Sequence, residues 1–104
     1  MTATTYKLPE PARKVCDLFR LLAGHEVLGL SPSEIAKGLN VPPSWVSQNL
    51  PPLAEQTGFV ERVADTNRWR LGVPFVRIAF NVSTEHHAAK KRLEDVGQRY
   101  SVTL

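Results

Sequence analysis

The chain has 104 residues, with 13 Lys and Arg against 10 Asp and Glu, so its formal net charge is +3. This length suits one domain with a modest core and excludes a two-domain enzyme with a separate cofactor module. Apolar residues make up 42% and charged residues 22%, which argues against wholesale disorder, and the small positive excess permits a nucleic-acid partner without requiring one.

Cysteine content and the N-terminal sequence favour a cytoplasmic protein. Cys16 is the only cysteine, which excludes an intramolecular disulfide and a cysteine-based zinc site. The N-terminal sequence MTATTYKLPEP lacks the apolar stretch of a signal peptide, and no apolar run approaches the ~20 residues that span a bilayer. We therefore expect a cytoplasmic protein with no membrane partner.

A polar arm, predicted to be flexible, covers residues 1–9, and an amphipathic helix is predicted over residues 10–23. The apolar face of this helix has the spacing i, i+3, i+4 and i+7 and consists of Val15, Leu18, Phe19 and Leu22. Gly24 ends the helix. Cys16 lies beside the apolar face, so we expect it to be a small buried side chain rather than a reactive thiol.

The clearest helix start is a capping box at residues 31–34, SPSE. Its serine and glutamate can each bind the other's backbone N–H, and proline suits the first helical position. The short helix ends at Asn40, which tolerates the left-handed conformation. A second helix opens at residues 42–44 and runs towards Gln56. The inward apolar side chains predict a helix-turn-helix; they are Ile35, Ala36, Leu39, Val41, Val46 and Leu50.

After Gly58 the pattern changes to that of short strands. Residues 59–63 (FVERV) and 68–71 (RWRL) flank a polar turn at residues 64–67. Two strands with a basic hairpin after a helix-turn-helix predict a winged helix. The expected fold class is α+β, mainly α, with the winged helix-turn-helix in residues 10–73.

Residues 74–104 are predicted to be a long C-terminal helical segment for dimerisation. Side chains spaced alternately by four and three residues form a heptad seam, which consists of Phe75, Ala79, Val82, His86, Ala89, Leu93, Val96 and Tyr100. A helix of this length cannot bury its whole seam on the winged domain, so we expect a two-fold homodimer. Two alternatives are a second helix start near Ser83-Thr84, and packing of Phe75, Ile78 and Phe80 on the winged core.

The stretch LSPSEIAKGLNVPPSWVSQNLPPLAEQTGFVERVADTNRWRLG resembles the N-terminal DNA-binding domain of the IclR family of bacterial transcription regulators. The shared features are the capping box, E-I-A, a proline before the recognition helix, G-[FY]-[VL]-E-R and R-[WY]-R-L-G, and the resemblance covers residues 11–72. It implies a regulator that binds double-stranded DNA. The family's effector-binding domain is not in this sequence, so we expect no small-molecule sensing. A bacterial or phage regulator of the kind that mobile elements carry fits this organisation.

The expected recognition helix departs from the family pattern in two ways. Pro51-Pro52 removes two backbone donors and is expected to break or kink the helix near Leu50. In addition, residues 42–56 contain no Lys or Arg.

The resemblance places the N-terminal half of this helix in the major groove. The predicted base contacts are Ser44, Trp45, Ser47 and Gln48. Gln48 can pair with adenine, and Trp45 either contacts a thymine methyl or packs against its own helix or the neighbouring turn. The predicted DNA backbone contacts are Asn49, Arg62, Asn67, Arg68 and Arg70, and all but the first belong to the hairpin. In the alternative reading, Arg62 or Arg70 pairs with Glu61 or Asp65 in a half-exposed hairpin.

No catalytic, metal or cofactor site is predicted, because the chain lacks a Gly-rich phosphate loop and any arguable nucleophile–base pair. His86 and His87 point to different helical faces, so His86 is expected to set register rather than to bind a metal. Residues 1–61 hold 5 basic and 6 acidic residues, whereas residues 62–104 hold 8 and 4. The cations thus belong to the hairpin and the last helix. Two alternatives stay open: a winged-helix module that binds a protein partner through its uncharged helix, and non-specific DNA binding.

Overall fold

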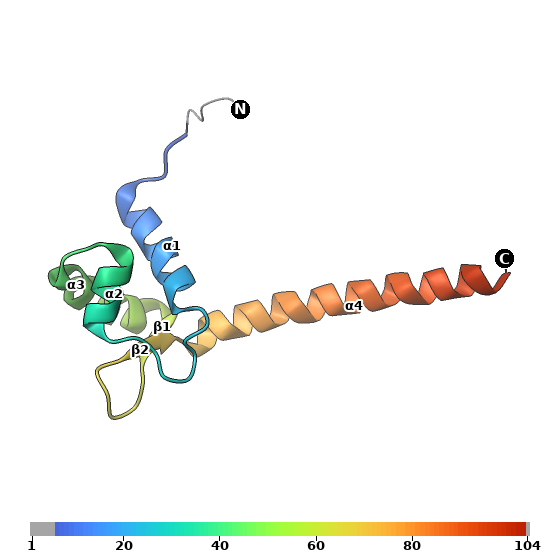
Figure 1. Cartoon of the computed structure of the whole chain (residues 1–104). Helices are drawn as coiled ribbons and strands as arrows, with labels where there is room; N and C mark the ends of the chain where they lie inside the picture. The colour runs from blue at the N-terminus through green and yellow to red at the C-terminus, as the bar shows by residue number, and fades with distance from the viewer. Residues whose placement is uncertain (1–5, 104) are drawn as a thin grey trace.

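The computed structural model describes the backbone of residues 6–103 and the side chains of residues 6–98. Its elements are α1 (Glu10–Leu22), α2 (Pro32–Leu39), α3 (Pro43–Thr57), β1 (Val60–Arg62), β2 (Trp69–Leu71) and α4 (Val73–Thr103). We call residues 60–71 the wing, and α1 to α3 with the wing the body. Figure 1 shows α4 projecting from this body as a single long rod. The α+β, mainly α, winged-helix class predicted from the sequence is confirmed.

One apolar core joins α1, α2 and α3 to the wing. It consists of Leu18, Leu22, Leu30, Ile35, Ala36, Leu39, Val46, Leu50, Val60, Trp69 and Leu71. Each large aliphatic side chain buried here stabilises the fold by about 1.5–3 kcal/mol relative to exposure. The inward faces predicted for the three helices are therefore largely confirmed, while Val15, Phe19 and Val41 are half-buried at the edge.

The capping box of α2 forms as predicted. The Glu34 N–H donates to Ser31 Oγ at 3.2 Å, and the Ser31 N–H donates to Glu34 Oε1 at 2.8 Å. The helix ends at Asn40, whose φ of 55° is left-handed. Lys14 of α1 makes a further contact here, which no pattern in the sequence predicts. Its Nζ donates to the Leu39 carbonyl at 2.8 Å and caps this end of α2.

The expected break at Pro51-Pro52 is wrong, since α3 continues through both prolines. Leu50 is fully buried, and Leu53 and Ala54 pack against the core on the same side of the helix. The prolines lie on the exposed side. The carbonyls that lose their helical donors there can be satisfied by water, so core packing outweighs the local cost of the prolines.

The wing is a two-stranded antiparallel sheet in which Val60 lies opposite Leu71 and Arg62 opposite Trp69. Residue 30 extends this sheet, because Leu30 and Trp69 exchange two backbone hydrogen bonds of 2.8 Å. Gly29 makes this approach possible. Its φ is +71°, and a Cβ at this position would lie 2.5 Å from the Trp69 carbonyl oxygen.

α4 is one uninterrupted helix of 31 residues, so no second helix starts near Ser83-Thr84. Phe75 packs on the body, with its ring centroid 4.9 Å from that of Phe19 and 5.6 Å from that of Phe59. Ile78 and Phe80 are not buried against it, since they are 53% and 68% exposed. After its first turns α4 leaves the body.

Two further sequence predictions concern α1 and the chain ends. Cys16 is exposed, so the expectation that it is buried is wrong. It lies beside the face that carries Leu18 and Leu22, and the body covers only that face. Residues 6–9 of the expected arm form no helix or strand. Residues 1–5 and the side chain of Tyr100 lie outside the part that the structure describes.

Candidate nucleic-acid interface

The N-terminal half of α3 presents a polar surface to solvent. Ser44, Ser47 and Gln48 are exposed, whereas Val46 and Leu50 on the opposite side are buried and fasten the helix to the body. Figure 1 shows that α3 and the wing lie at the end of the molecule away from the free end of α4. The structure thus brings three of the four predicted base-contacting residues onto one accessible surface.

Trp45 and Asn49 lie differently from these three residues. Trp45 is half-buried and packs against the core. Asn49 Nδ2 donates to the Trp45 carbonyl at 2.8 Å. Both side chains therefore hold α3 in shape, and any contact of theirs with DNA stays a prediction.

The turn of the wing is ordered by its own hydrogen bonds. Thr66 Oγ1 donates to the Val63 carbonyl at 2.9 Å and accepts from the Arg68 N–H at 3.0 Å. Asp65 has a left-handed φ of 61°. Asn67 is exposed beside it. The turn therefore presents Asn67 on a preformed backbone.

Arg68, a predicted phosphate contact, is largely engaged inside the molecule. Its Nε and Nη2 donate to the carbonyls of Leu28 and Gly29, each at 3.0 Å. The same Nη2 lies 3.1 Å from Glu34 Oε1. Arg68 thus ties the wing to the loop before α2 and to the capping box.

Glu34 is held in its charged form by these neighbours. The Ser31 N–H contributes most and the charge of Arg68 adds to it, and together they keep the pKa of Glu34 below its ordinary value of 4.5. The carboxylate therefore stays ionised where it closes the start of α2, next to the positive end of the helix dipole.

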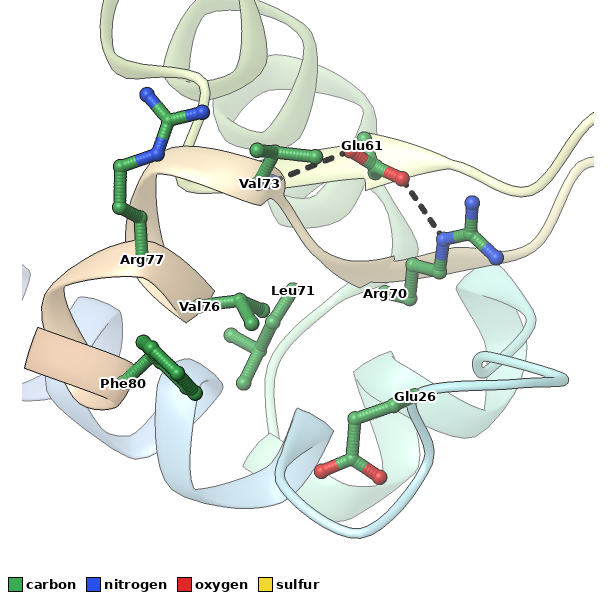
Figure 2. A pocket seen from close by; sticks show the side chains of 8 residues that line it. All are labelled: Glu26, Glu61, Arg70, Leu71, Val73, Val76, Arg77 and Phe80. Carbon is green, nitrogen blue, oxygen red and sulfur yellow. Dashed lines mark hydrogen bonds and ion pairs between the residues drawn. The ribbon is translucent and has the colours of Figure 1, made fainter. Parts of the chain in front are cut away.

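Arg70 pairs with Glu61, as the alternative reading of the hairpin proposed. Arg70 Nε lies 2.8 Å from Glu61 Oε2 across the two strands. The other oxygen of Glu61 accepts from the Val73 N–H at 3.3 Å and so fastens the first residue of α4 to the wing. Figure 2 shows both bonds converging on this one carboxylate.

Arg62 is the most available arginine of the wing. Its side chain is exposed, and its guanidinium carbon lies 4.6 Å from the centre of the Trp69 ring. Among the described residues no carboxylate forms an ion pair with it. A cation stacked on an aromatic face keeps its outward N–H groups free for phosphate.

A groove of about 460 Å³ lies at the base of α4, on the side away from α3 (Figure 2). Its apolar lining consists of Leu71, Val73, Val76 and Phe80, and its charged rim consists of Glu26, Glu61, Arg70 and Arg77. Within the described residues, three or more metal-ligating side chains nowhere come together. No helix in that part of the chain is both long and apolar enough to cross a membrane.

No protein-family model matches the chain, and no curated protein matches it. Among solved structures, that of a mutant of ZitR from Lactococcus lactis is similar, with 21% sequence identity and a TM-score of 0.46. The alignment covers 95% of this chain and 66% of the ZitR chain, so this chain spans just under two thirds of that one. The winged-helix assignment rests on the elements of this chain itself, and membership of the IclR family stays a prediction.

Proposed function

We propose that the protein is a DNA-binding transcription regulator of the IclR-like winged-helix type, which acts as a homodimer on a palindromic site. The observation that carries this proposal is the exposed polar surface of Ser44, Ser47 and Gln48 on a helix that is anchored in the core by its other side. Amide and hydroxyl side chains on such a helix can read base edges in the major groove.

In this proposal, the wing makes the contacts with the DNA backbone. Arg62 and Asn67 are exposed and free to approach phosphate or the minor groove. Arg68 and Arg70 are engaged in the contacts described above, so their contribution to DNA affinity is expected to be small. With few free cations on this surface, we expect a shallower salt dependence than that of strongly basic DNA-binding domains.

The homodimer is supported by the exposed apolar side chains of α4. Val82, Leu93 and Val96 are 65%, 73% and 44% exposed, although all three belong to the heptad seam. An apolar strip of this length in water favours a partner helix, and a second copy is the most economical one. Leu93→Asp is expected to convert the dimer into a monomer in light scattering, with unchanged helix content in the body.

A second candidate function is supported by a specific observation. α3 carries no Lys or Arg, and two of the three wing arginines are engaged internally. An uncharged surface with Pro51 and Pro52 beside it suits a protein partner better than a phosphate backbone. The same residues would then form a protein-binding patch.

Binding to random-sequence and genomic duplexes at two salt concentrations tests these readings. Loss of affinity with added salt together with enrichment of a palindrome supports the regulator. No binding to any duplex at low salt contradicts it and favours the protein-binding module. Salt-sensitive binding without enrichment indicates a non-specific DNA-binding protein.

Two substitutions test the assigned roles. Gln48→Ala is expected to cost about 1–3 kcal/mol on the preferred site and nothing on random DNA. Arg62→Ala is expected to weaken binding to all duplexes alike. Gln56→Ala is the matched control, since Gln56 is also an exposed glutamine of α3 but lies in its last turn. Equal effects of Gln48→Ala on both kinds of DNA would show that it does not read sequence.

A further inference from the structure

The seam of α4 is asymmetric along its length. Phe75 is covered by the body, so the part of the seam left open among the described side chains consists of Ala79, Val82, His86, Ala89, Leu93 and Val96. The bulkiest apolar side chain, Leu93, lies in the C-terminal half, and Ala79 lies at the N-terminal end. A partner helix packs well only if it places larger side chains opposite the small ones of this seam and smaller side chains opposite the large ones.

We infer that a second copy of the chain packs its α4 against this seam in the antiparallel direction. The inference rests on the proposed homodimer. With the two-fold axis between residues 87 and 88, Ala79 meets Val96 of the partner subunit, Val82 meets the partner's Leu93, and His86 meets the partner's Ala89. Each layer joins a smaller side chain to a larger one, so the volume varies less from layer to layer than it would between identical side chains, as close packing favours.

The parallel arrangement packs less well. Each seam residue would then face its own copy, which puts alanine against alanine at residues 79 and 89 and leucine against leucine at residue 93. The alanine layers would leave cavities, which are destabilising in a packed interface. Two copies of His86 would also face each other, which would put two polar imidazoles into one layer of the apolar seam.

The charges beside the seam agree with the antiparallel direction. Glu85 directly precedes His86, and Arg92 directly precedes Leu93, so both occupy the same flanking position of the heptad. In an antiparallel pair, this flanking position of one helix faces the same position of the other helix. Glu85 of each subunit then meets the partner's Arg92, which gives two such pairs in the dimer. Glu85 has no basic residue three or four positions away on its own helix, where Asn81, Val82, Ala88 and Ala89 stand. Its own helix therefore offers no ion pair at these spacings, and Arg92 of a second copy can supply one.

A parallel pair would join Glu85 to Lys90 of the partner subunit instead, and this difference makes the direction testable by charge reversal. Glu85→Arg is expected to weaken dimerisation about tenfold in sedimentation equilibrium, since two attractive pairs become repulsive. Adding Arg92→Glu is expected to restore the affinity. Adding Lys90→Glu to Glu85→Arg is expected not to restore it. Lys91→Glu, on the opposite side of the helix, is the control and should leave dimerisation unchanged.

A disulfide test gives an independent readout. In a Cys16→Ser background, the double variant Val82→Cys, Leu93→Cys is expected to form cross-linked dimers under mild oxidation, whereas each single variant is not. Cross-linking of both single variants, or rescue of Glu85→Arg by Lys90→Glu, would overturn the antiparallel direction and leave the homodimer standing. A wild-type chain that is monomeric in sedimentation would overturn the homodimer and the inference together.

Discussion

The guanidinium of Arg68 in the wing lies 3.1 Å from the carboxylate of Glu34, the residue that closes the capping box of α2. Two backbone carbonyls of the intervening loop, those of Leu28 and Gly29, bind the same arginine. One side chain therefore joins the wing, the loop and the start of the helix-turn-helix. The relative position of wing and recognition helix, on which DNA reading depends, is fixed in part by this contact.

Arg68→Ala is expected to lower the free energy of unfolding by about 1–3 kcal/mol, because it removes charge-assisted hydrogen bonds to two carbonyls. The ion pair with Glu34 adds little, since both groups are partly exposed. Urea denaturation measures the change. Arg62→Ala is the matched control and is expected to cost about 0.5–1 kcal/mol, the value of an exposed cation–π contact. Equal losses in the two variants would show that the Arg68 contacts do not support the wing.

The lowered pKa of Glu34 makes the capping box sensitive to acid. Its folded-state pKa lies below the unfolded value of 4.5, mainly because the Ser31 N–H donates to the carboxylate. The stabilisation from this group is thus complete above pH 4.5 and is lost as the pH falls through the folded-state pKa. Glu34→Gln is expected to be less stable than wild type at pH 7, and the difference should shrink towards pH 3.

Thermal unfolding at a series of pH values tests this expectation. Gln56→Ala, an exposed substitution in α3 that changes no titratable group, serves as the control, and its difference from wild type should not vary with pH in this way. A difference between wild type and Glu34→Gln that stays constant from pH 7 to pH 3 would contradict the assigned role of Glu34.

Gly29→Ala is expected to destabilise the protein more than Gly24→Ala. Both glycines have positive φ, so both substitutions carry the strain of a left-handed alanine, about 1–2 kcal/mol. A Cβ at Gly24 meets nothing within 4 Å, whereas a Cβ at Gly29 meets the Trp69 carbonyl oxygen at 2.5 Å. Only Gly29→Ala therefore disturbs the pairing of Leu30 with Trp69. Urea denaturation of both variants gives the comparison, and equal losses would mean that this pairing contributes little.

Local signals explain why much of the fold could be predicted from the sequence. Three of these signals depend only on residues a few positions away in the sequence. They are the capping box, the left-handed Asn40 and the strand pattern around residues 64–67. Their outcome depends little on the rest of the chain. The apolar periodicity of α1 to α3 likewise predicts which side faces the core.

The contacts that shape the candidate site could not be predicted in this way. Lys14 binds a carbonyl 25 residues away, and Arg68 binds one 40 residues away. Such contacts depend on how the elements pack, which periodicity does not encode. The same limit explains the wrong expectation of a helix break at Pro51-Pro52, where burial of Leu50 overrides the local preference of proline.

The spacing of DNA half-sites follows from the proposed antiparallel α4 pair. With the axis between residues 87 and 88, the two copies of Val73 lie about 44 Å apart at 1.5 Å per residue. The recognition helices lie farther out, since Figure 1 shows α3 beyond the start of α4. This separation exceeds one turn of B-DNA, about 34 Å, so half-sites two turns apart are expected.

Synthetic duplexes that carry the selected half-site twice test this spacing. Centre-to-centre separations of about 10, 15 and 21 base pairs place the second half-site one, one and a half and two turns away. We expect the tightest binding at about 21 base pairs and the weakest at about 15, where the second half-site lies on the opposite face of the duplex. Tightest binding at about 10 base pairs would contradict the antiparallel pair, because its two recognition helices could not reach adjacent turns.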